Sequence, residues 1–116
     1  MPVALIIDDE PAILRLLSFA LRNMGCEPVT APDAEVALEE LENRKPDIII
    51  ADVRLPGMDG VEFTQQVKSD SRFAQVPVLL ISAFGEPRVN GGHRADQFLA
   101  KPFDIDSLED AVKPYL

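Results

Sequence analysis

The sequence predicts a doubly wound α/β domain, in which a five-stranded parallel sheet carries helices on both faces. Short apolar runs such as residues 3–7 and 48–51 lack polar alternation, which is typical of strands buried on both faces of a parallel sheet. Between these runs, apolar residues recur at three- and four-residue spacing, as they do in amphipathic helices. The strict alternation of the two patterns, with short connections, favours a parallel sheet between two helical layers.

The elements follow from this apolar pattern and from the residues that interrupt it. Pro28 falls within a short apolar segment and suits a strand at the edge of the sheet. Acidic residues can cap helices at Asp33 and Asp104, and the first helix should stop at Gly25. An acidic residue ahead of Pro11 should also cap that first helix. Among the residues of this helix that are expected to face the core, Phe19 is the least well placed. We expect strands at residues 3–7, 27–30, 48–51, 76–81 and 97–100, and helices at residues 11–24, 34–43, 60–69 and 105–115.

The segment between the fourth and fifth strands has the weakest pattern. Residues 84–96 contain Pro87 and three glycines, with Val89 as the one candidate core residue. A helix is due here if the alternation holds, but Gly91 and Gly92 together would cost about 2 kcal/mol relative to alanines. We therefore expect a fourth helix that is short or irregular.

Length and charge restrict the classes of function. The 116 residues fit a single domain, residues 1–116. The net charge of −9 at pH 7 repels phosphate backbones and argues against direct nucleic-acid binding. Cys26 is the single cysteine, so no intramolecular disulfide can form, and we interpret it as a small half-buried hydrophobe. Without a secretory leader or an apolar stretch of about 18 residues, we expect a cytoplasmic protein that does not contact membranes.

Polar and charged side chains stand at the carboxyl ends of the expected strands. Asp8 and Asp9 follow the first strand, Asp52 follows the third, Ser82 the fourth and Lys101 the fifth. If the strand order is 2-1-3-4-5, the first and third strands are neighbours where the order reverses, which is where open α/β sheets bind ligands. Three carboxylates would then share one crevice, and protonation or a cation must relieve their repulsion. Carboxylate oxygens without a nearby Cys or His suit Mg²⁺.

The same strand ends suit phosphoryl transfer. A carboxylate such as Asp52 can attack a phosphoryl group as a nucleophile and form an aspartyl phosphate. Mg²⁺ and Lys101 would stabilise the oxygens of the transferring group, and Ser82 could hydrogen-bond the attached phosphoryl. The competing interpretation makes Asp52 a simple strand-end cap, but packing alone does not explain the other polar strand ends.

Four segments also carry a resemblance to a known family. They are LIIDDEP at residues 5–11, IIIADVRLPGMDG at residues 48–60, LLISA at residues 79–83 and DQFLAKPF at residues 96–103. In this order they resemble the receiver domain of two-component response regulators, over the whole chain. The resemblance implies a flavodoxin-like fold with strand order 2-1-3-4-5. It also implies a sensor histidine kinase or phosphotransfer protein as the phosphoryl source, and a downstream protein or output domain as the target.

The resemblance assigns roles to the residues at the strand ends. It implies that Asp52 is the phosphoacceptor and Lys101 the phosphate-binding lysine. Asp8 and Asp9 would form the Mg²⁺ pocket, and Arg54 would contribute its backbone carbonyl to the metal. Such a domain catalyses only its own phosphorylation and dephosphorylation, and it is not otherwise an enzyme.

Further positions match the parts of the family that respond to phosphorylation. Ser82 corresponds to the switch hydroxyl, and Phe98 to an aromatic residue that turns inward. Arg54 and Phe84 flank the phosphoryl group, where we expect bulky side chains to hinder the attacking water and to lengthen the phosphorylated lifetime. The Lys101–Pro102 bond is a candidate for the cis form.

Other classes of protein stay open at this point. A phosphatase of the haloacid-dehalogenase type uses a similar aspartate and lysine, but it normally has a second acid where this chain has Arg54. A flavodoxin-like cofactor module would place a phosphate near Asp8, Asp9 and Glu10, which would repel it. A receiver that binds partners without phosphorylation is disfavoured because every charged site position is filled. We expect either a single-domain regulator or the receiver part of a longer protein.

Overall fold

The computed structural model describes residues 1–85 and 95–116 and contains a five-stranded parallel sheet. The elements are β1 (Val3–Ile7), α1 (Pro11–Asn23), β2 (Glu27–Ala31), α2 (Ala34–Asn43), β3 (Ile48–Asp52), α3 (Gly60–Ser69), β4 (Val78–Ser82), β5 (Gln97–Ala100), α4 (Ile105–Val112) and the 3₁₀ turn η1 (Lys113–Tyr115). The strands lie in the order β2-β1-β3-β4-β5, as predicted. The prediction of a short or irregular helix between β4 and β5 falls on residues 86–94, which lie outside the described residues.

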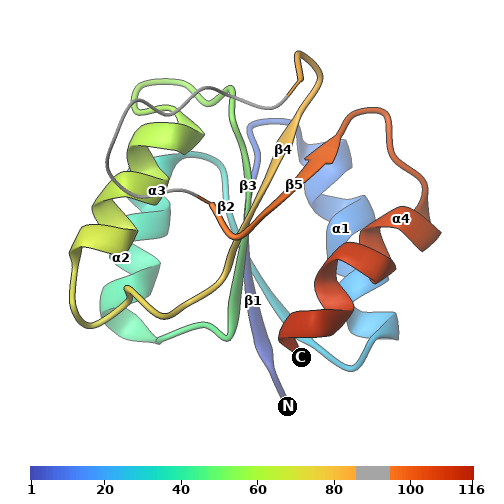
Figure 1. The fold of residues 1–116 in the computed structure, drawn as a ribbon, viewed down its shortest axis with the longest axis horizontal. Helices are drawn as coiled ribbons and strands as arrows, with labels where there is room; N and C mark the ends of the chain where they lie inside the picture. The colour runs from blue at the N-terminus through green and yellow to red at the C-terminus, as the bar shows by residue number, and fades with distance from the viewer. Residues whose placement is uncertain (86–94) are drawn as a thin grey trace.

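The helices form two layers, so the prediction of a doubly wound fold is confirmed. Figure 1 shows α2 and α3 on one side of the sheet and α1 and α4 on the other. Alternate strand side chains enter separate apolar cores: Leu5 and Ile49 pack toward α2 and α3, and Ile6 and Ile50 pack toward α1 and α4. β3 is buried along its whole length, because it is central and covered on both faces. Packing on both faces therefore fixes the position of the strand that ends at Asp52.

Two aspartates extend the sheet at the amino ends of strands. Asp47, just before β3, donates its N–H to the Val3 carbonyl at 2.7 Å and accepts the Val3 N–H through Oδ2 at 2.7 Å. Asp96, just before β5, makes the same pair of bonds with Val78, at 2.9 Å and 2.8 Å. Each carboxylate supplies an acceptor for a main-chain N–H at the end of the ladder. The starts of β3 and β5 are thus tied to the first residue of a neighbouring strand.

Side-chain caps begin three of the helices. Asp33, Asp59 and Asp104 each accept the N–H of the residue three positions later, at 2.8, 2.8 and 2.7 Å, which confirms the caps predicted at Asp33 and Asp104. The acidic cap expected ahead of Pro11 is wrong in its detail, because Glu10 makes no capping hydrogen bond. Its carboxylate lies instead within 4.8 Å of the acidic groups that precede it.

Strand β4 begins two residues later than predicted. It starts at Val78, whereas the apolar run that suggested the strand begins at Val76. Val76 belongs to the preceding turn, where its N–H donates to the Phe73 carbonyl at 3.0 Å. Pro77 has no N–H and cannot contribute a donor to the ladder. A prediction from apolar character alone therefore overestimates the length of this strand.

Two helical predictions also need correction. Phe19 does not face the core but is 65% exposed, because Leu17, Ala20 and Leu21 occupy the buried face of α1. The last α-helix ends at Val112 and continues as η1, in which a proline interrupts the α-helical hydrogen bonds.

In the parts of the chain that the structure describes, no helix has both the length and the apolar character needed to cross a membrane.

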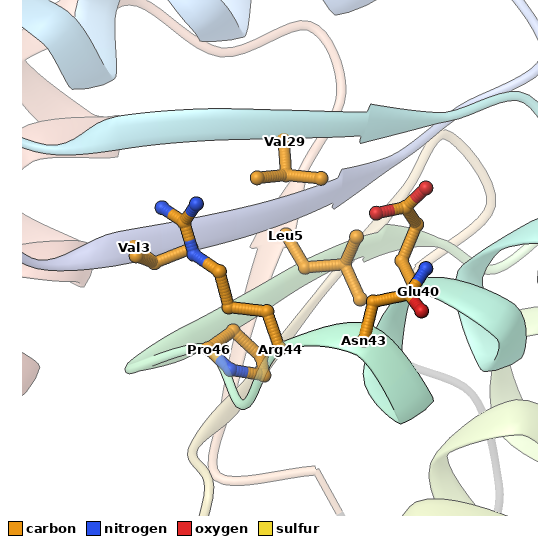
Figure 2. A pocket seen from close by; sticks show the side chains of 7 residues that line it. All are labelled: Val3, Leu5, Val29, Glu40, Asn43, Arg44 and Pro46. Carbon is orange, nitrogen blue, oxygen red and sulfur yellow. The ribbon is translucent and has the colours of Figure 1, made fainter.

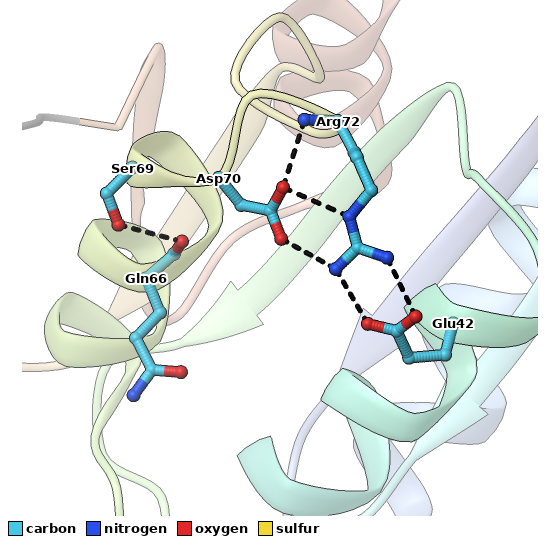
Figure 3. A network of polar contacts seen from close by, with 5 residues as sticks. All are labelled: Glu42, Gln66, Ser69, Asp70 and Arg72. Carbon is cyan, nitrogen blue, oxygen red and sulfur yellow. Dashed lines mark hydrogen bonds and ion pairs between the residues drawn. The ribbon is translucent and has the colours of Figure 1, made fainter.

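Arg72 ties the end of α2 to the loop after α3. Its guanidinium donates to Glu42 through two bonds of 2.8 Å and to Asp70 at 2.8 and 3.1 Å (Figure 3). These hydrogen bonds hold the pKa of both carboxyls below their usual range. All three side chains reach solvent, so we regard the contact as a surface clamp between neighbouring helices rather than as part of a site.

Candidate functional site

Lys101 brings together two carboxylates from different strands. Its Nζ lies 2.9 Å from Asp52 Oδ2 and 3.3 Å from Asp8 Oδ2. Asp8 follows β1, Asp52 ends β3 and Lys101 follows β5, so the parallel strands bring all three residues to one edge of the sheet. The side chains are 1% (Asp8), 8% (Asp52) and 16% (Lys101) exposed. A largely buried group of charges therefore forms where the sequence predicts a site.

The charges in this group do not balance. Burial raises the pKa of the Asp8 carboxyl, although the Glu10 N–H and the Lys101 ammonium favour its ionised form. Burial disfavours the charged form of Lys101 as well, but the hydrogen bond to Asp52 and the charges of both carboxylates outweigh this effect and raise the pKa of Lys101. Lys101 thus stays protonated and offsets only one of two negative charges. A further cation would relieve the rest.

An acidic cluster adjoins this group. Asp8, Asp9 and Glu10 each offer a carboxylate oxygen, and these atoms all lie within 4.8 Å of one another. Asp8 is buried, whereas Asp9 and Glu10 are exposed. The donor set consists of oxygen atoms alone, which fits a hard cation such as Mg²⁺. Glu10 was not predicted as a ligand, because the sequence shows only that it belongs to the acidic run after the first strand.

Ser82 and the residues that follow β3 and β4 line the same edge. Ser82 is 3% exposed, and its Oγ accepts the Phe84 N–H at 3.1 Å; within residues 1–85 and 95–116 its own proton has no acceptor. The Arg54 N–H donates to Asp52 Oδ1 at 3.1 Å. The Arg54 guanidinium carbon lies 4.2 Å from the centre of the Phe84 ring, a cation–π contact that joins the two loops. The sequence predicted both flanking residues but not their contact.

The remaining predicted site residues lie on or just after β5. Phe98 is half-buried and packs against the apolar core that faces α2 and α3. Its role as a switch stays a prediction. The Lys101–Pro102 peptide bond is cis.

A separate hollow lies at the opposite end of the sheet. It has a volume of about 200 Å³. Its lining side chains, shown in Figure 2, are those of Val3, Leu5, Val29, Glu40, Asn43, Arg44 and Pro46. None of the predicted site residues lines it, so the chemistry belongs to the charged strand ends and not to this hollow.

Removing the Asp8 charge should stabilise the protein. At pH 7 without divalent cations, we expect Asp8→Asn to raise Tm by a few degrees, because a buried charge that repels Asp52 is lost. Since the folded-state pKa of Asp8 is raised, the protonated carboxyl contributes stability below its ordinary pKa of 3.8, and this contribution is lost as the pH rises through the folded-state value. The difference in Tm should therefore shrink as the pH falls toward 3.8.

Thermal unfolding across this pH range, with and without Mg²⁺, checks the prediction. The exposed neighbour Asp9 provides the control, since Asp9→Asn removes the same charge without relieving burial. A lower Tm for Asp8→Asn at pH 7 would contradict the argument. Mg²⁺ should stabilise Asp8→Asn less than the wild type, because one oxygen donor has lost its charge.

Comparison with known proteins agrees with the fold and the arrangement of the strand ends. Residues 4–113 match the family described as the response regulator receiver domain. Because this match spans nearly the whole chain, the chain belongs to the receiver domains of two-component signalling. Receiver domains are phosphoacceptor signalling domains rather than enzymes in the usual sense. Because the chain belongs to this family, the two alternative classes, a phosphatase of the haloacid-dehalogenase type and a flavodoxin-like cofactor module, are excluded.

The chain is similar to curated proteins from several bacteria. It is 36% identical over 115 residues to the alkaline phosphatase synthesis transcriptional regulatory protein PhoP of Bacillus subtilis. This match covers 97% of this chain and 47% of PhoP. It is 31% identical over 118 residues to protein PilG of Pseudomonas aeruginosa, covering 97% of this chain and 85% of PilG. The chain spans about half the length of PhoP and of other curated relatives.

Solved structures show the same fold. The chemotaxis protein CheY4 of Vibrio cholerae superposes with a TM-score of 0.89 at 29% identity, covering 100% of this chain and 99% of CheY4. The receiver domain of a signal transduction histidine kinase from Syntrophus aciditrophicus gives a TM-score of 0.90 at 29% identity, covering 100% of this chain and 90% of that one.

Proposed function

We propose that this domain takes a phosphoryl group onto Asp52 from a phosphohistidine of a sensor histidine kinase or a phosphotransfer protein. The observation that carries the proposal is the contact of Asp52 Oδ2 with Lys101 Nζ at 2.9 Å, at a strand end shared with a second buried carboxylate. An Asp52 oxygen forms a bond to phosphorus while the phosphorus–nitrogen bond of the phosphohistidine breaks. The leaving imidazole takes the electron pair of that bond.

The neighbouring residues have separate tasks in this reaction. The Lys101 ammonium stabilises the negative charge that builds up on the phosphoryl oxygens, and the Ser82 hydroxyl donates a hydrogen bond to one of these oxygens. Asp8, Asp9, Asp52 and the backbone carbonyl of Arg54 would hold Mg²⁺. When bound there, Mg²⁺ supplies positive charge that offsets the charge of the transferring group.

Intact mass measured after incubation with acetyl phosphate tests the proposal. We expect a Mg²⁺-dependent gain of one phosphoryl group in the wild type and none in Asp52→Ala. Asp106→Ala, which removes an exposed carboxylate on α4, serves as a control and should behave as the wild type. An equal gain in Asp52→Ala would place the phosphoryl elsewhere. No gain from acetyl phosphate or from a phosphorylated kinase, together with no Mg²⁺ binding, would refute the proposal.

Phosphorylation would act by shifting a balance between two conformations that already exist in the free domain. Ser82 and Phe98 would connect the phosphoryl group to this balance. The partner that reads it is a downstream protein or an output domain. We further propose that residues 1–116 act as one domain, located in the cytoplasm and without direct contact to nucleic acid or membrane. The net charge of −9 supports the absence of nucleic-acid contact.

The contact between Arg54 and Phe84 should lengthen the lifetime of the phosphorylated form. Phe84 is 73% exposed, and its ring lies against the guanidinium of the residue that follows Asp52 by two positions. Together these side chains hinder the approach of water. We expect Phe84→Ala to lose phosphate severalfold faster than the wild type, measured as the decay of the phosphorylated mass after removal of the donor. Phe19→Ala removes another exposed phenylalanine and should not change the decay. An unchanged decay in Phe84→Ala would refute this role.

A further inference from the structure

Strand β5 is less constrained by packing than its neighbours. β3 and β4 are buried along their whole length, whereas β5 has half-buried residues and an exposed Ala100. Among the strands that the structure describes, it lies at the edge of the sheet and pairs with β4 alone. An edge strand with incompletely buried faces specifies its own register weakly. Nevertheless, Lys101 follows this strand directly and must meet carboxylates that belong to other strands.

Asp96 fixes the start of β5 by several interactions. Its N–H and its Oδ2 both bond to Val78, at 2.9 and 2.8 Å. The same Oδ2 lies 2.7 Å from the Nζ of Lys68 on α3. The Asp96 carbonyl accepts the hydroxyl of Tyr115 at 3.3 Å. A single residue therefore joins β5 to β4, to α3 and to the carboxyl-terminal turn.

Lys68 is a rigid partner for this aspartate. Its side chain is only 9% exposed, and its ammonium also donates to the carbonyls of Val76, at 2.6 Å, and Ala74, at 3.4 Å. Its three donors thus all have acceptors. Since these acceptors belong to the chain that leads into β4, Lys68 holds Asp96 in a fixed place relative to β4.

We propose that Asp96, held by Lys68, is a positioning residue for phosphoryl transfer: it sets the register of β5 and thereby places Lys101 against Asp52. The inference rests on the proposed phosphorylation of Asp52. At the far end of β5, the Lys101 N–H donates to the Ser82 carbonyl at 2.9 Å, so the strand is tied to β4 at both ends. A slip of one residue would shift Lys101 by about 3.3 Å. A shift of this size would break the ion pair in which Lys101 Nζ now lies 2.9 Å from Asp52 Oδ2.

The first experiment measures phosphorylation of Asp96→Ala and Lys68→Met with saturating acetyl phosphate and Mg²⁺, at a temperature where each variant is folded. We expect the rate constant to fall about tenfold in both, the factor that matches a lost charge-assisted hydrogen bond. Mg²⁺ affinity should not change, because its proposed ligands do not lie on β5. Lys68→Arg should restore most of the rate by keeping the charge.

Asp47 offers a matched control. It makes the same pair of bonds to Val3 as Asp96 makes to Val78, but it precedes a fully buried strand whose register is fixed by packing. We expect Asp47→Ala to phosphorylate at the rate of the wild type. An equal loss of rate in Asp47→Ala and Asp96→Ala would overturn the inference, because any loosened strand start would then have the same effect.

A second measurement does not depend on phosphorylation. Amide hydrogen exchange of the Lys101 N–H should become about tenfold faster in Asp96→Ala, while exchange of the Val53 N–H, which bonds to Ile81 between β3 and β4, should not change. Unchanged exchange at Lys101 would overturn the inference, even if the variant were less stable. If the wild type accepts no phosphoryl group, the proposed function fails, whereas this exchange measurement still decides whether Asp96 positions Lys101.

Discussion

Lys101→Met should slow the phosphorylation of Asp52 by a factor of about 10²–10³ without weakening Mg²⁺ binding. The variant keeps a long apolar side chain but loses the ammonium that contacts both buried carboxylates. Loss of one preorganised group that stabilises developing charge has an effect of about this size. Mg²⁺ affinity should hold or increase, since a competing cation no longer lies between Asp8 and Asp52. Mass spectrometry over time and a Mg²⁺ titration measure the two effects separately.

The same variant should depend on Mg²⁺ for its stability. Removing one partner of a buried ion group costs about 3–5 kcal/mol when the other charges stay behind. Mg²⁺ should recover more of this loss in Lys101→Met than it adds to the wild type. Lys45→Met, which removes an exposed lysine, is the control and should change neither rate nor stability. A rate close to that of the wild type in Lys101→Met would contradict the proposed role of Lys101.

Gly60→Ala should destabilise the fold by about 3 kcal/mol or more and lower Tm by roughly 10 °C or more. A Cβ atom at this position would lie 2.3 Å from the Asp52 carbonyl oxygen and 2.9 Å from the Val53 Cα. Both are backbone atoms at the end of β3, so no side chain can rotate to make room. The Gly60 N–H also donates to the Val53 carbonyl at 2.8 Å, which holds α3 tightly against the strand end.

Thermal and denaturant unfolding measure this effect. Gly25→Ala is the matched control: Gly25 has a φ of +85°, but a Cβ there would meet nothing within 4 Å. We expect it to cost about 1 kcal/mol from backbone strain alone. Equal losses in the two variants would mean that the close approach of α3 to β3 contributes nothing beyond ordinary glycine effects.

The sequence predicts the fold and most of the site because both depend on the same pattern. A strand buried on both faces is recognisable as an apolar run, and its end is recognisable as the first polar residue after that run. Asp8, Asp52, Ser82 and Lys101 are all such residues. In a parallel sheet these positions meet at one edge, so their proximity follows from the strand order without knowledge of any side-chain conformation.

Contacts between side chains from distant segments are not encoded in this pattern. Nothing in the spacing of Arg54 and Phe84 indicates that their side chains stack, and Asp96 gives no sign of its bond to Lys68. Phe19 shows a related limit: residues at helical spacing define a broad apolar stripe, but the register of α1 on the sheet decides which member is left in solvent.

The hydroxyl contact of Tyr115 has an optical consequence. The chain contains one tyrosine and no tryptophan, so its intrinsic fluorescence comes essentially from this ring. The hydroxyl of that ring donates to the Asp96 carbonyl, at the start of the strand that leads to Lys101. The emission of the unlabelled protein therefore reports on the docking of β5. A change in emission on phosphorylation would reveal a rearrangement of this strand that began at the opposite end.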